Sequence, residues 1–488
     1  MEALGQVRFG TDGIRGIAGE FPLDPLTVLT IGRAIGLWLH QQTRGRQSPP
    51  KVLVGRDTRK SGHMLLHMLA GGLLAEGVNV YDLGVMTTPG VAFCTRRQQA
   101  DLGIVISASH NPYEQNGIKL FGADGFKLDD AKEEAIEALI AAADPQPPTS
   151  ELGRFEVDHP LNAVQYVEHL TAGQDARLDN LRIVLDCANG AASYLAVEAF
   201  RAAGGKHLIL MNADPDGANI NVRAGSEHVR RDRAALLQAI RANQADLGIA
   251  FDGDADRVVF VTPGGMLIDG DHTLGILALE LQKADKLRGS TVVATDMSNR
   301  GLEDFLAARG IILNRSKVGD RYVMERLREG GFTLGGEQAG HVIILDDDHT
   351  AGDGIYVALL MAFIAARNKA DHAPSLHELA SSIPRYPQVI ASAHLNGRTD
   401  LAQVEGLAEL QRETLALFEG KGRVNLRFSG TEPNLLRAMV EGGPGTSMAQ
   451  VVDRALALCH RVAQATNTPQ PRIDLVDCAT GEPIEQQD

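Results

Sequence analysis

Three well-separated stretches of the sequence share one local pattern, and this repetition constrains the fold more than any other feature. The stretches are residues 51–84, 182–210 and 291–319. Each begins with a short β-branched run that ends near an aspartate. A polar loop follows, then apolar residues at three- and four-residue spacing, and then a glycine before a second apolar run. That order is typical of a strand, a helix and a second strand, and continuous apolar strands indicate sheets covered on both faces. We therefore expect three related α/β domains.

The remainder of the chain lacks this pattern. Residues 375–466 carry strand-like runs and two helical stretches in a different order, which indicates a separate module. The predicted fold class is α/β, with three related mixed-sheet α/β domains and a C-terminal α+β domain. The expected domains are residues 1–155, 156–261, 262–372 and 373–466, followed by a flexible tail at 467–488 that is rich in proline, glutamine and acidic residues.

Charge and composition exclude several classes of partner. The 488 residues carry a formal net charge of −15, so neither nucleic acids nor anionic membranes are expected to bind. No apolar run is long enough to cross a bilayer, and the first residues contain no apolar signal core. The four cysteines are far apart, as in proteins of a reducing compartment. We expect a cytoplasmic protein, monomeric or homodimeric, that binds a small anionic molecule in a local basic pocket.

Asp252, Asp254 and Asp256 alternate directly after an apolar run. Alternate residues of an extended chain point to the same side, roughly 7 Å apart. Three carboxylates on one side repel one another unless a cation lies between them, and oxygen ligands favour a hard ion such as Mg²⁺. Arg257 follows immediately and could hold a phosphate. We predict a Mg²⁺ site here, and the alternative is a polar loop between strands.

Ser109 lies in a polar loop after the apolar run at 104–106. It could be a nucleophile, a phosphate site, or only a residue that ends a strand or caps a helix. The G-x-S-x-G pattern of one serine hydrolase class is absent. The adjacent His110 is expected to point away from Ser109, as neighbours on an extended chain do. Lys119 has apolar neighbours, so partial burial would lower its pKa and suit it to acid–base chemistry; a solvated lysine is the alternative.

Two glycine-rich loops add further candidates. Arg15, in the loop at 9–16, could bind phosphate, and the alternative is a tight turn. In the loop at 335–341, Glu337 could hydrogen-bond hydroxyl groups and His341 could move protons. The alternative for this second loop is a β-turn with an exposed histidine.

A third loop, at 427–437, has the composition of an anion site. Arg427, Ser429, the Gly430 backbone and Thr431 could form an anion-binding nest with a guanidinium clamp. No Walker A lysine motif accompanies it, which argues against a nucleotide-binding P-loop. A serine, a carboxylate cluster, a hydroxyl-binding loop and an anion clamp in separate domains call for one cleft between those domains.

In this order along the chain, five motifs resemble those of the α-D-phosphohexomutase family. They are TDGIRG, SASHNP with NGIK, DGDADR, GGEQAGH and RFSGTEP, and the resemblance covers about residues 5–465. It implies four domains around a central cleft and a reaction in which phosphorylated Ser109 exchanges a phosphoryl group with a hexose phosphate through a sugar 1,6-bisphosphate, which also activates the enzyme.

The resemblance also implies roles for the candidate residues. One Mg²⁺ per chain would be held by Asp252, Asp254, Asp256 and the phosphate on Ser109. Arg15, Lys119 and His341 would act on the reacting atoms, with Lys119 and His341 as the candidate acid and base. The residues implied in substrate binding are Arg257 at the reacting phosphate or sugar oxygens, Glu337 at the sugar, and Arg427, Ser429, Gly430 and Thr431 at the non-reacting phosphate.

Within the family, the motifs are most similar to those of the bacterial members that interconvert glucosamine 6-phosphate and glucosamine 1-phosphate, a step that feeds UDP-N-acetylglucosamine and cell-envelope synthesis. Members that act on mannose and glucose phosphates are the alternative. Ala339 stands where the family usually has a sugar-contacting serine, and a missing hydroxyl alters discrimination between sugars more than catalysis. A Mg²⁺-dependent phosphatase or a non-catalytic sugar-phosphate-binding protein is less consistent with the sequence, because neither needs both Ser109 and the loop at 427–431.

Overall fold

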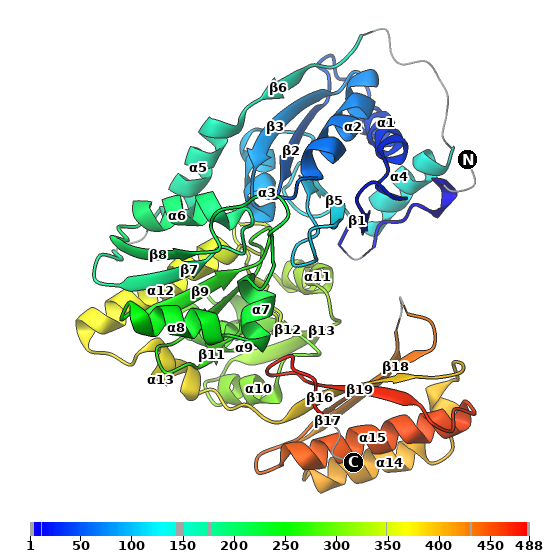
Figure 1. Ribbon diagram of the computed structural model, residues 1–488, viewed down its shortest axis with the longest axis vertical. Coiled ribbons are helices and arrows are strands. Elements are labelled where there is room, and N and C mark those ends of the chain that lie inside the picture. Colours follow the sequence, from blue (N-terminus) through cyan, green and yellow to red (C-terminus); the bar gives the residue numbers. More distant parts are fainter. Residues whose placement is uncertain are drawn as a thin grey trace. The chain divides into compact units, whose positions relative to one another are not determined.

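The computed structural model describes residues 4–10, 12–142, 151–173, 177–347, 349–429 and 432–485, which form two compact units. The first unit comprises Met1–Met297 and Leu313–Ala380, and the second comprises Ser298–Ile312 and Ser381–Asp488. Figure 1 labels many of their helices and strands along the chain. Three short 3₁₀ helices lie at η1 (Leu4–Gln6), η2 (Arg288–Ser290) and η3 (Leu401–Gln403).

The first sheet has six strands in the order β1-β5-β4-β2-β3-β6. Its strands are β1 (Ile14–Ile17), β2 (Lys51–Arg56), β3 (Asn79–Val85), β4 (Leu102–Ile106), β5 (Gln115–Gly122) and β6 (Phe155–Val157). Its helices are α1 (Pro25–Gln42), α2 (Gly62–Ala75), α3 (Thr88–Arg97) and α4 (Asp130–Ala142). β2 runs parallel to β3 and β4, whereas β5 is antiparallel to both β4 and β1. The predicted strand-helix-strand unit at 51–84 is therefore β2, α2 and β3.

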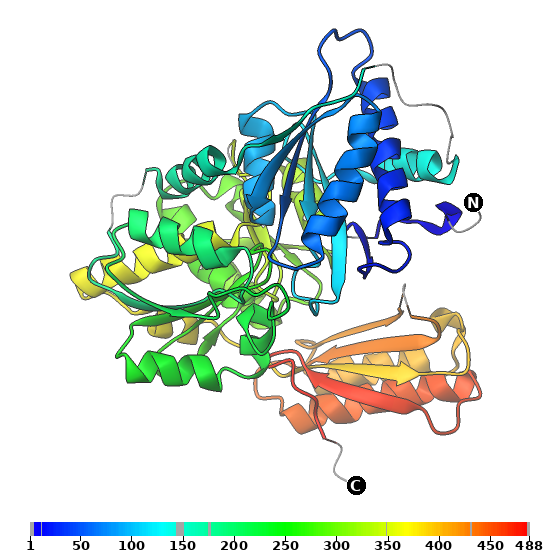
Figure 2. The same cartoon turned by 45° about the horizontal axis from the view of Figure 1, so that its top comes forward.

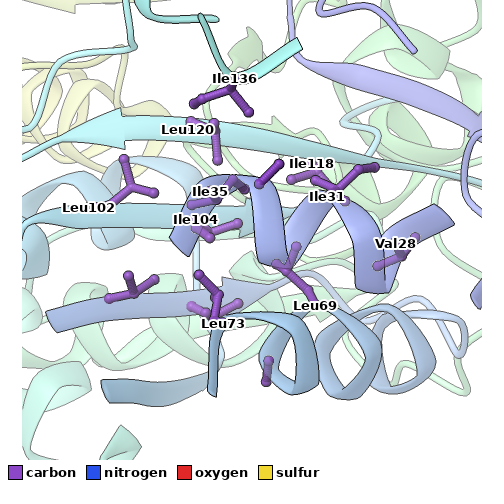
Figure 3. Packing of buried hydrophobic residues seen from close by; sticks show 14 of the residues in the cluster. Val28, Ile31, Ile35, Leu69, Leu73, Leu102, Ile104, Ile118, Leu120 and Ile136 are labelled. Atoms are coloured by element: carbon purple, nitrogen blue, oxygen red, sulfur yellow. The ribbon is translucent and has the colours of Figure 1, made fainter. Parts of the chain in front are cut away.

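Apolar side chains from α1, α2 and the strands beneath them form the core of this sheet (Figure 3). Helices α1 and α2 approach closely because glycines lie at the contact. A Cβ atom on Gly32 would lie 2.2 Å from the carbonyl oxygen of Leu69, and one on Gly72 would lie 2.2 Å from that of Leu29. The pair shields β4 and β5, so the loops that leave these strands rest on a rigid base.

The second sheet has the order β11-β10-β9-β7-β8. Its strands are β7 (Arg182–Asp186), β8 (His207–Met211), β9 (Leu247–Phe251), β10 (Val258–Val261) and β11 (Leu267–Ile268). Its helices are α5 (His159–Thr171), α6 (Ala192–Ala202), α7 (Gly225–Arg231) and α8 (Ala234–Ala242). The predicted unit at 182–210 corresponds to β7, α6 and β8. β9 and β10 pair antiparallel, and the turn between them carries the aspartate triplet.

The third sheet has the order β13-β12-β14-β15. Its strands are β12 (Thr291–Thr295), β13 (Ile312–Ser316), β14 (Leu334–Gly336) and β15 (Val342–Ile344). The helices in this part of the sequence are α9 (Gly270–Lys283), α10 (Arg300–Ala307), α11 (Asp320–Gly330), α12 (Gly354–Asp371) and α13 (Leu376–Ser381). The predicted unit at 291–319 corresponds to β12, α10 and β13. Helix α10 nevertheless belongs to the second compact unit.

The fourth sheet is antiparallel, in the order β17-β18-β16-β19. Its strands are β16 (Gln388–His394), β17 (Arg423–Phe428), β18 (Leu435–Glu441) and β19 (Arg472–Asp477). Helices α14 (Leu407–Leu417) and α15 (Met448–Ala465) cover one of its faces (Figure 2).

The expectation of a flexible tail from residue 467 is wrong for residues 472–477. These residues form β19, which pairs with β16 and buries Leu475. Without a neighbour, this edge of β16 would carry unpaired backbone N–H and C=O groups. Even a short strand can hydrogen-bond them.

These four sheets confirm the predicted fold class of three α/β domains and a C-terminal α+β domain. Within the described residues, no helix combines the length and apolar character needed to cross a membrane.

Candidate active site

Ser109 is buried in the loop after β4, and its side chain faces the second sheet. Its Oγ donates a hydrogen bond to Oδ2 of Asp252 at 2.6 Å. Its φ of +53° places it in the left-handed region, which costs a non-glycine residue about 1–3 kcal/mol and persists only where the surroundings enforce it. The structure thus brings the predicted serine and the predicted metal ligands together.

Asp252, Asp254 and Asp256 are buried in the turn between β9 and β10. One carboxylate oxygen from each lies within 4.8 Å of the others. Burial raises the pKa of Asp252 well above its ordinary value, and the neighbouring aspartates raise it further. Oδ1 of Asp254 and Oδ1 of Asp256 are buried and accept no hydrogen bond. Orphaned oxygens in an all-oxygen cluster fit a hard divalent cation, so this group could hold a metal.

Lys119, on β5, lies against this cluster. Its Nζ is 2.9 Å from Oδ2 of Asp254 and 3.7 Å from Oδ2 of Asp256. It also lies 3.1 Å from Asp12, a residue that the sequence analysis missed although it belongs to the TDGIRG motif. Burial acts to lower the pKa of Lys119, but the three carboxylates outweigh it and raise the pKa above its ordinary value. The expectation of a lowered pKa is therefore wrong, because the sequence shows apolar neighbours but not the acidic partners.

Arg15 and Arg257 approach the serine loop from two sides. Nη1 of Arg15 donates to the carbonyl oxygen of Ala108 at 3.4 Å, and its other amino group pairs with Asp12. Nη1 of Arg257 donates to Nδ1 of His110 at 3.1 Å. Two guanidinium groups beside Ser109 create the positive environment that a phosphate needs.

The expectation that His110 points away from Ser109 is wrong. Nδ1 of His110 lies 3.3 Å from Oγ of Ser109. The reason is that Ser109 is left-handed, so the alternation of an extended chain does not apply at this position. Burial and then Arg257 lower the pKa of His110 to about 4, which keeps the imidazole neutral at pH 7.

Glu337 and His341 lie in the turn between β14 and β15. His341 is buried, and its Nδ1 is 3.7 Å from Oδ2 of Asp256. Burial acts to lower the pKa of His341, but the neighbouring Asp256 carboxylate raises it. Glu337 accepts a hydrogen bond from the backbone N–H of Gly319 at 3.1 Å. Both predicted residues therefore belong to the same unit as Ser109 and the triplet.

Further polar residues of this site went unpredicted. Thr88 donates from Oγ1 to Asp254 at 2.6 Å. Lys127 donates to Asp12 at 2.6 Å and pairs with Asp320. Asp320 follows a glycine in the segment KVGDRYV at 317–323, and its neighbouring basic residues were a usable signal. Nothing in the sequence singles out Thr88.

The predicted anion loop lies in the second unit. Arg427, near the end of β17, is exposed. Oγ of Ser429 accepts from the backbone N–H of Glu432 at 3.1 Å, and Arg398 donates to the carbonyl oxygen of Ser429. Gly430 and Thr431 lie outside the described residues.

Comparisons with known proteins agree with this fold and site. The four phosphoglucomutase/phosphomannomutase domain families match in order: α/β/α domain I at residues 6–147, domain II at 164–265, domain III at 269–386 and the C-terminal domain at 392–458. A crystal structure of a phosphoglucomutase/phosphomannomutase family protein from Burkholderia thailandensis superposes with a TM-score of 0.77 at 27% identity, over 97% of this chain and 99% of that one. Fold and site together define an isomerase of the phosphohexomutase class.

Curated relatives narrow the class further. A phosphoglucosamine mutase from Cereibacter sphaeroides is 42% identical over 92% of this chain and 98% of its own length. A second, from Symbiobacterium thermophilum, is 44% identical over 93% of this chain and 98% of its own length. The chain belongs to the phosphoglucosamine mutase family.

Proposed function

We propose that this protein interconverts glucosamine 6-phosphate and glucosamine 1-phosphate through a phosphoserine at Ser109 and a sugar 1,6-bisphosphate, which also serves as activator. One observation carries the proposal: the buried Ser109 hydroxyl donates to Asp252 of the carboxylate cluster at 2.6 Å. A hydroxyl fixed at an acidic cation site suits a phosphoryl carrier. In a serine hydrolase, a basic histidine would instead take the serine proton.

We propose Mg²⁺ as the cation, one per chain, held by Asp252, Asp254, Asp256 and the phosphate on Ser109. The oxygen-only donor set and the two orphaned carboxylate oxygens support this assignment. When bound, the ion would neutralise the oxygens of the phosphoryl group in transfer.

The transfer requires balanced movement of one phosphoryl group and one proton. In the first half-reaction the bond from Ser109 Oγ to phosphorus breaks and a bond from a sugar hydroxyl to phosphorus forms. The sugar hydroxyl gives its proton to a base, and the freed Ser109 Oγ takes up a proton from an acid. Lys119 and His341, which both lie at Asp256, are proposed as the groups that exchange protons with the reacting oxygens. After the bisphosphate turns over, its other phosphoryl group returns to Ser109.

The remaining residues are proposed to hold the substrate. Arg15 and Arg257 would bind the reacting phosphate, because their guanidinium groups border the serine loop. Glu337 would contact sugar hydroxyls. The residues proposed to hold the non-reacting phosphate are Arg427, Ser429, Gly430 and Thr431.

We further propose that the enzyme is cytoplasmic and acts as a monomer or homodimer. The four cysteines are unpaired and buried in the described residues, which suits a reducing compartment.

Intact-mass analysis combined with a mutase assay tests this function. Wild-type protein should carry one phosphate, and Ser109→Ala should lose both that phosphate and mutase activity. The control Ser48→Ala, at an exposed serine in the same domain, should lose neither. Full activity in Ser109→Ala would remove the proposed mechanism.

The sugar preference has its own test because Ala339 lacks the usual hydroxyl. Rates on glucosamine 6-phosphate should exceed those on mannose and glucose phosphates. A preference of about tenfold or more for mannose 1-phosphate would assign the protein to the alternative branch of the family.

A further inference from the structure

Arg59 and Asp57 form a buried ion pair next to the loop that contains Ser109. Neither residue takes part in the proposed chemistry. Arg59 and Asp57 follow β2, and both are about 1% exposed. Nε of Arg59 donates to Oδ2 of Asp57 at 2.8 Å. A buried charge of this kind needs a partner and a full set of hydrogen bonds.

The guanidinium of Arg59 has five N–H groups, and each has an acceptor. Apart from Asp57, all the acceptors are backbone carbonyl oxygens, three in the loop that contains Ser109 and one on Gln115, where β5 begins. Nη2 donates to Ser109 and Asn111 at 2.9 Å each, and Nη1 donates to Pro112 and to Gln115, the latter at 3.1 Å. The loop is therefore wrapped around one planar cation.

The amide of Ser109 is fixed by the same assembly. Its N–H donates to Oγ of Ser107 at 2.9 Å, and that hydroxyl donates to Oδ2 of Asp57 at 2.6 Å. From the segment between β8 and α7, Nδ2 of Asn221 donates to the carbonyl oxygen of Ser109 at 2.9 Å. Both polar groups of the Ser109 backbone are thus fixed in a conformation that a serine rarely adopts.

We propose that Arg59, oriented by Asp57, is a positioning residue for the phosphoryl transfer: it holds the Ser109 backbone left-handed so that Oγ faces the carboxylate cluster. The inference rests on the proposed function. Arg59 bonds the carbonyl side of Ser109, so it acts through the loop and not on the reacting atoms. A displacement of about 1 Å at a reacting group lowers the rate by about 100-fold.

Arg59→Lys provides the test, because lysine keeps the charge but has three donors on one atom in place of a planar fork. We expect kcat, measured per phosphorylated chain, to fall by about 100-fold. KM should change by less than about threefold, because Arg59 is not proposed to touch substrate. A purely structural role would reduce the amount of folded enzyme but not the turnover of each phosphorylated chain.

The matched control is Arg56→Lys. Arg56 also lies at the end of β2 and pairs with Asp82 at 3.2 Å, but none of its hydrogen bonds reaches the serine loop. It should retain wild-type kcat. If Arg59→Lys does not fold, Ser107→Ala tests the positioning role instead, because it removes only the hydroxyl between Asp57 and the Ser109 amide. We expect the kcat of Ser107→Ala to fall about tenfold.

If Arg59→Lys or Ser107→Ala keeps the wild-type kcat per phosphorylated chain, the positioning role is wrong, whereas the proposed function still stands. A wild-type protein without phosphate on Ser109 and without mutase activity would overturn the proposed function, and the inference with it.

Discussion

At the scale of single residues, Lys119 compensates the negative charge of the aspartate cluster. It is 1% exposed and lies within 4 Å of Asp12, Asp254 and Asp256. Removing one partner from a buried ionic group leaves uncompensated charge, which costs about 3–5 kcal/mol. We therefore expect Lys119→Met to lower the free energy of unfolding by about that amount in metal-free buffer, as measured by urea denaturation.

The control for this measurement is Lys132→Met. Lys132 pairs with Asp129 at 2.8 Å, but both side chains are about half exposed. An exposed pair contributes about 0–1 kcal/mol. If both variants lose the same free energy of unfolding, burial does not determine how much the charge pairing of Lys119 contributes to stability.

A second prediction at the scale of single residues concerns metal binding. If the aspartate triplet holds Mg²⁺, the ion stabilises the folded state by about 2.7 kcal/mol at 100 times its Kd. Asp254→Asn should lose this Mg²⁺-dependent shift in the unfolding midpoint. Asp186→Asn, at a buried aspartate that ends β7, should keep it. An unchanged shift in Asp254→Asn would place the ion elsewhere.

The meeting of Ser109 with the triplet could be predicted from sequence, because the resemblance to the phosphohexomutases implies that the phosphate on Ser109 and the three aspartates hold one Mg²⁺. The two lie on different sheets, so sheet topology alone does not bring them together. The raised pKa of Lys119 and the role of Arg59 could not be predicted. Lys119 depends on Asp12, a distant residue in another loop, and Arg59 looks like an ordinary polar loop residue until its carbonyl acceptors are in place. The pKa of Lys119 and the hydrogen bonding of Arg59 both depend on how deeply these side chains are buried. A local sequence pattern does not show burial.

At the scale of elements, glycines set the distance between α1 and α2. Gly72→Ala would place a Cβ 2.2 Å from a backbone oxygen of α1, where no flexible side chain can move away. Overpacking of this kind costs about 1–3 kcal/mol. Gly71, next to it on α2, has nothing within 4 Å of its Cβ position. Gly71→Ala should stabilise the protein by about 0.5–1 kcal/mol through helix propensity.

Thermal and urea unfolding of the two variants checks this contrast. Because both change the same residue type on the same helix, propensity contributes equally to each. If both stabilise the protein, the close approach of α1 and α2 does not constrain the packing.

Element identity could be predicted from periodicity, as the three strand-helix-strand units show. The packing partners of two elements, α10 and β19, could not be predicted. The pattern that identifies α10 as a helix is silent on its packing with the C-terminal sheet. The residues of β19 were hidden by a polar, proline-containing context, although Ile473 and Leu475 alternate as they would in a half-buried strand.

At the scale of the whole molecule, the second unit is assembled from segments far apart in the sequence. The backbone N–H of Arg300, at the start of α10, donates to Oε1 of Glu441 at 2.8 Å, and Glu441 is fully buried. Tyr386 donates from its hydroxyl to Asp304 of α10 at 2.8 Å and exchanges two backbone hydrogen bonds with the Asn299 side chain. These contacts tie residues 298–312 to the C-terminal sheet and helices.

The second unit should therefore open as one cooperative body. Leu475→Ala, in β19, removes a side chain that is 3% exposed and should destabilise this unit by about 2–5 kcal/mol. Hydrogen exchange followed by mass spectrometry should then show faster exchange in residues 381–485 and also in 298–312, while the first unit keeps its protection. Leu417→Ala, at a leucine that is 44% exposed in the same unit, should change exchange in neither segment. Faster exchange in 381–485 with unchanged protection in 298–312 would show that α10 does not unfold with the C-terminal sheet.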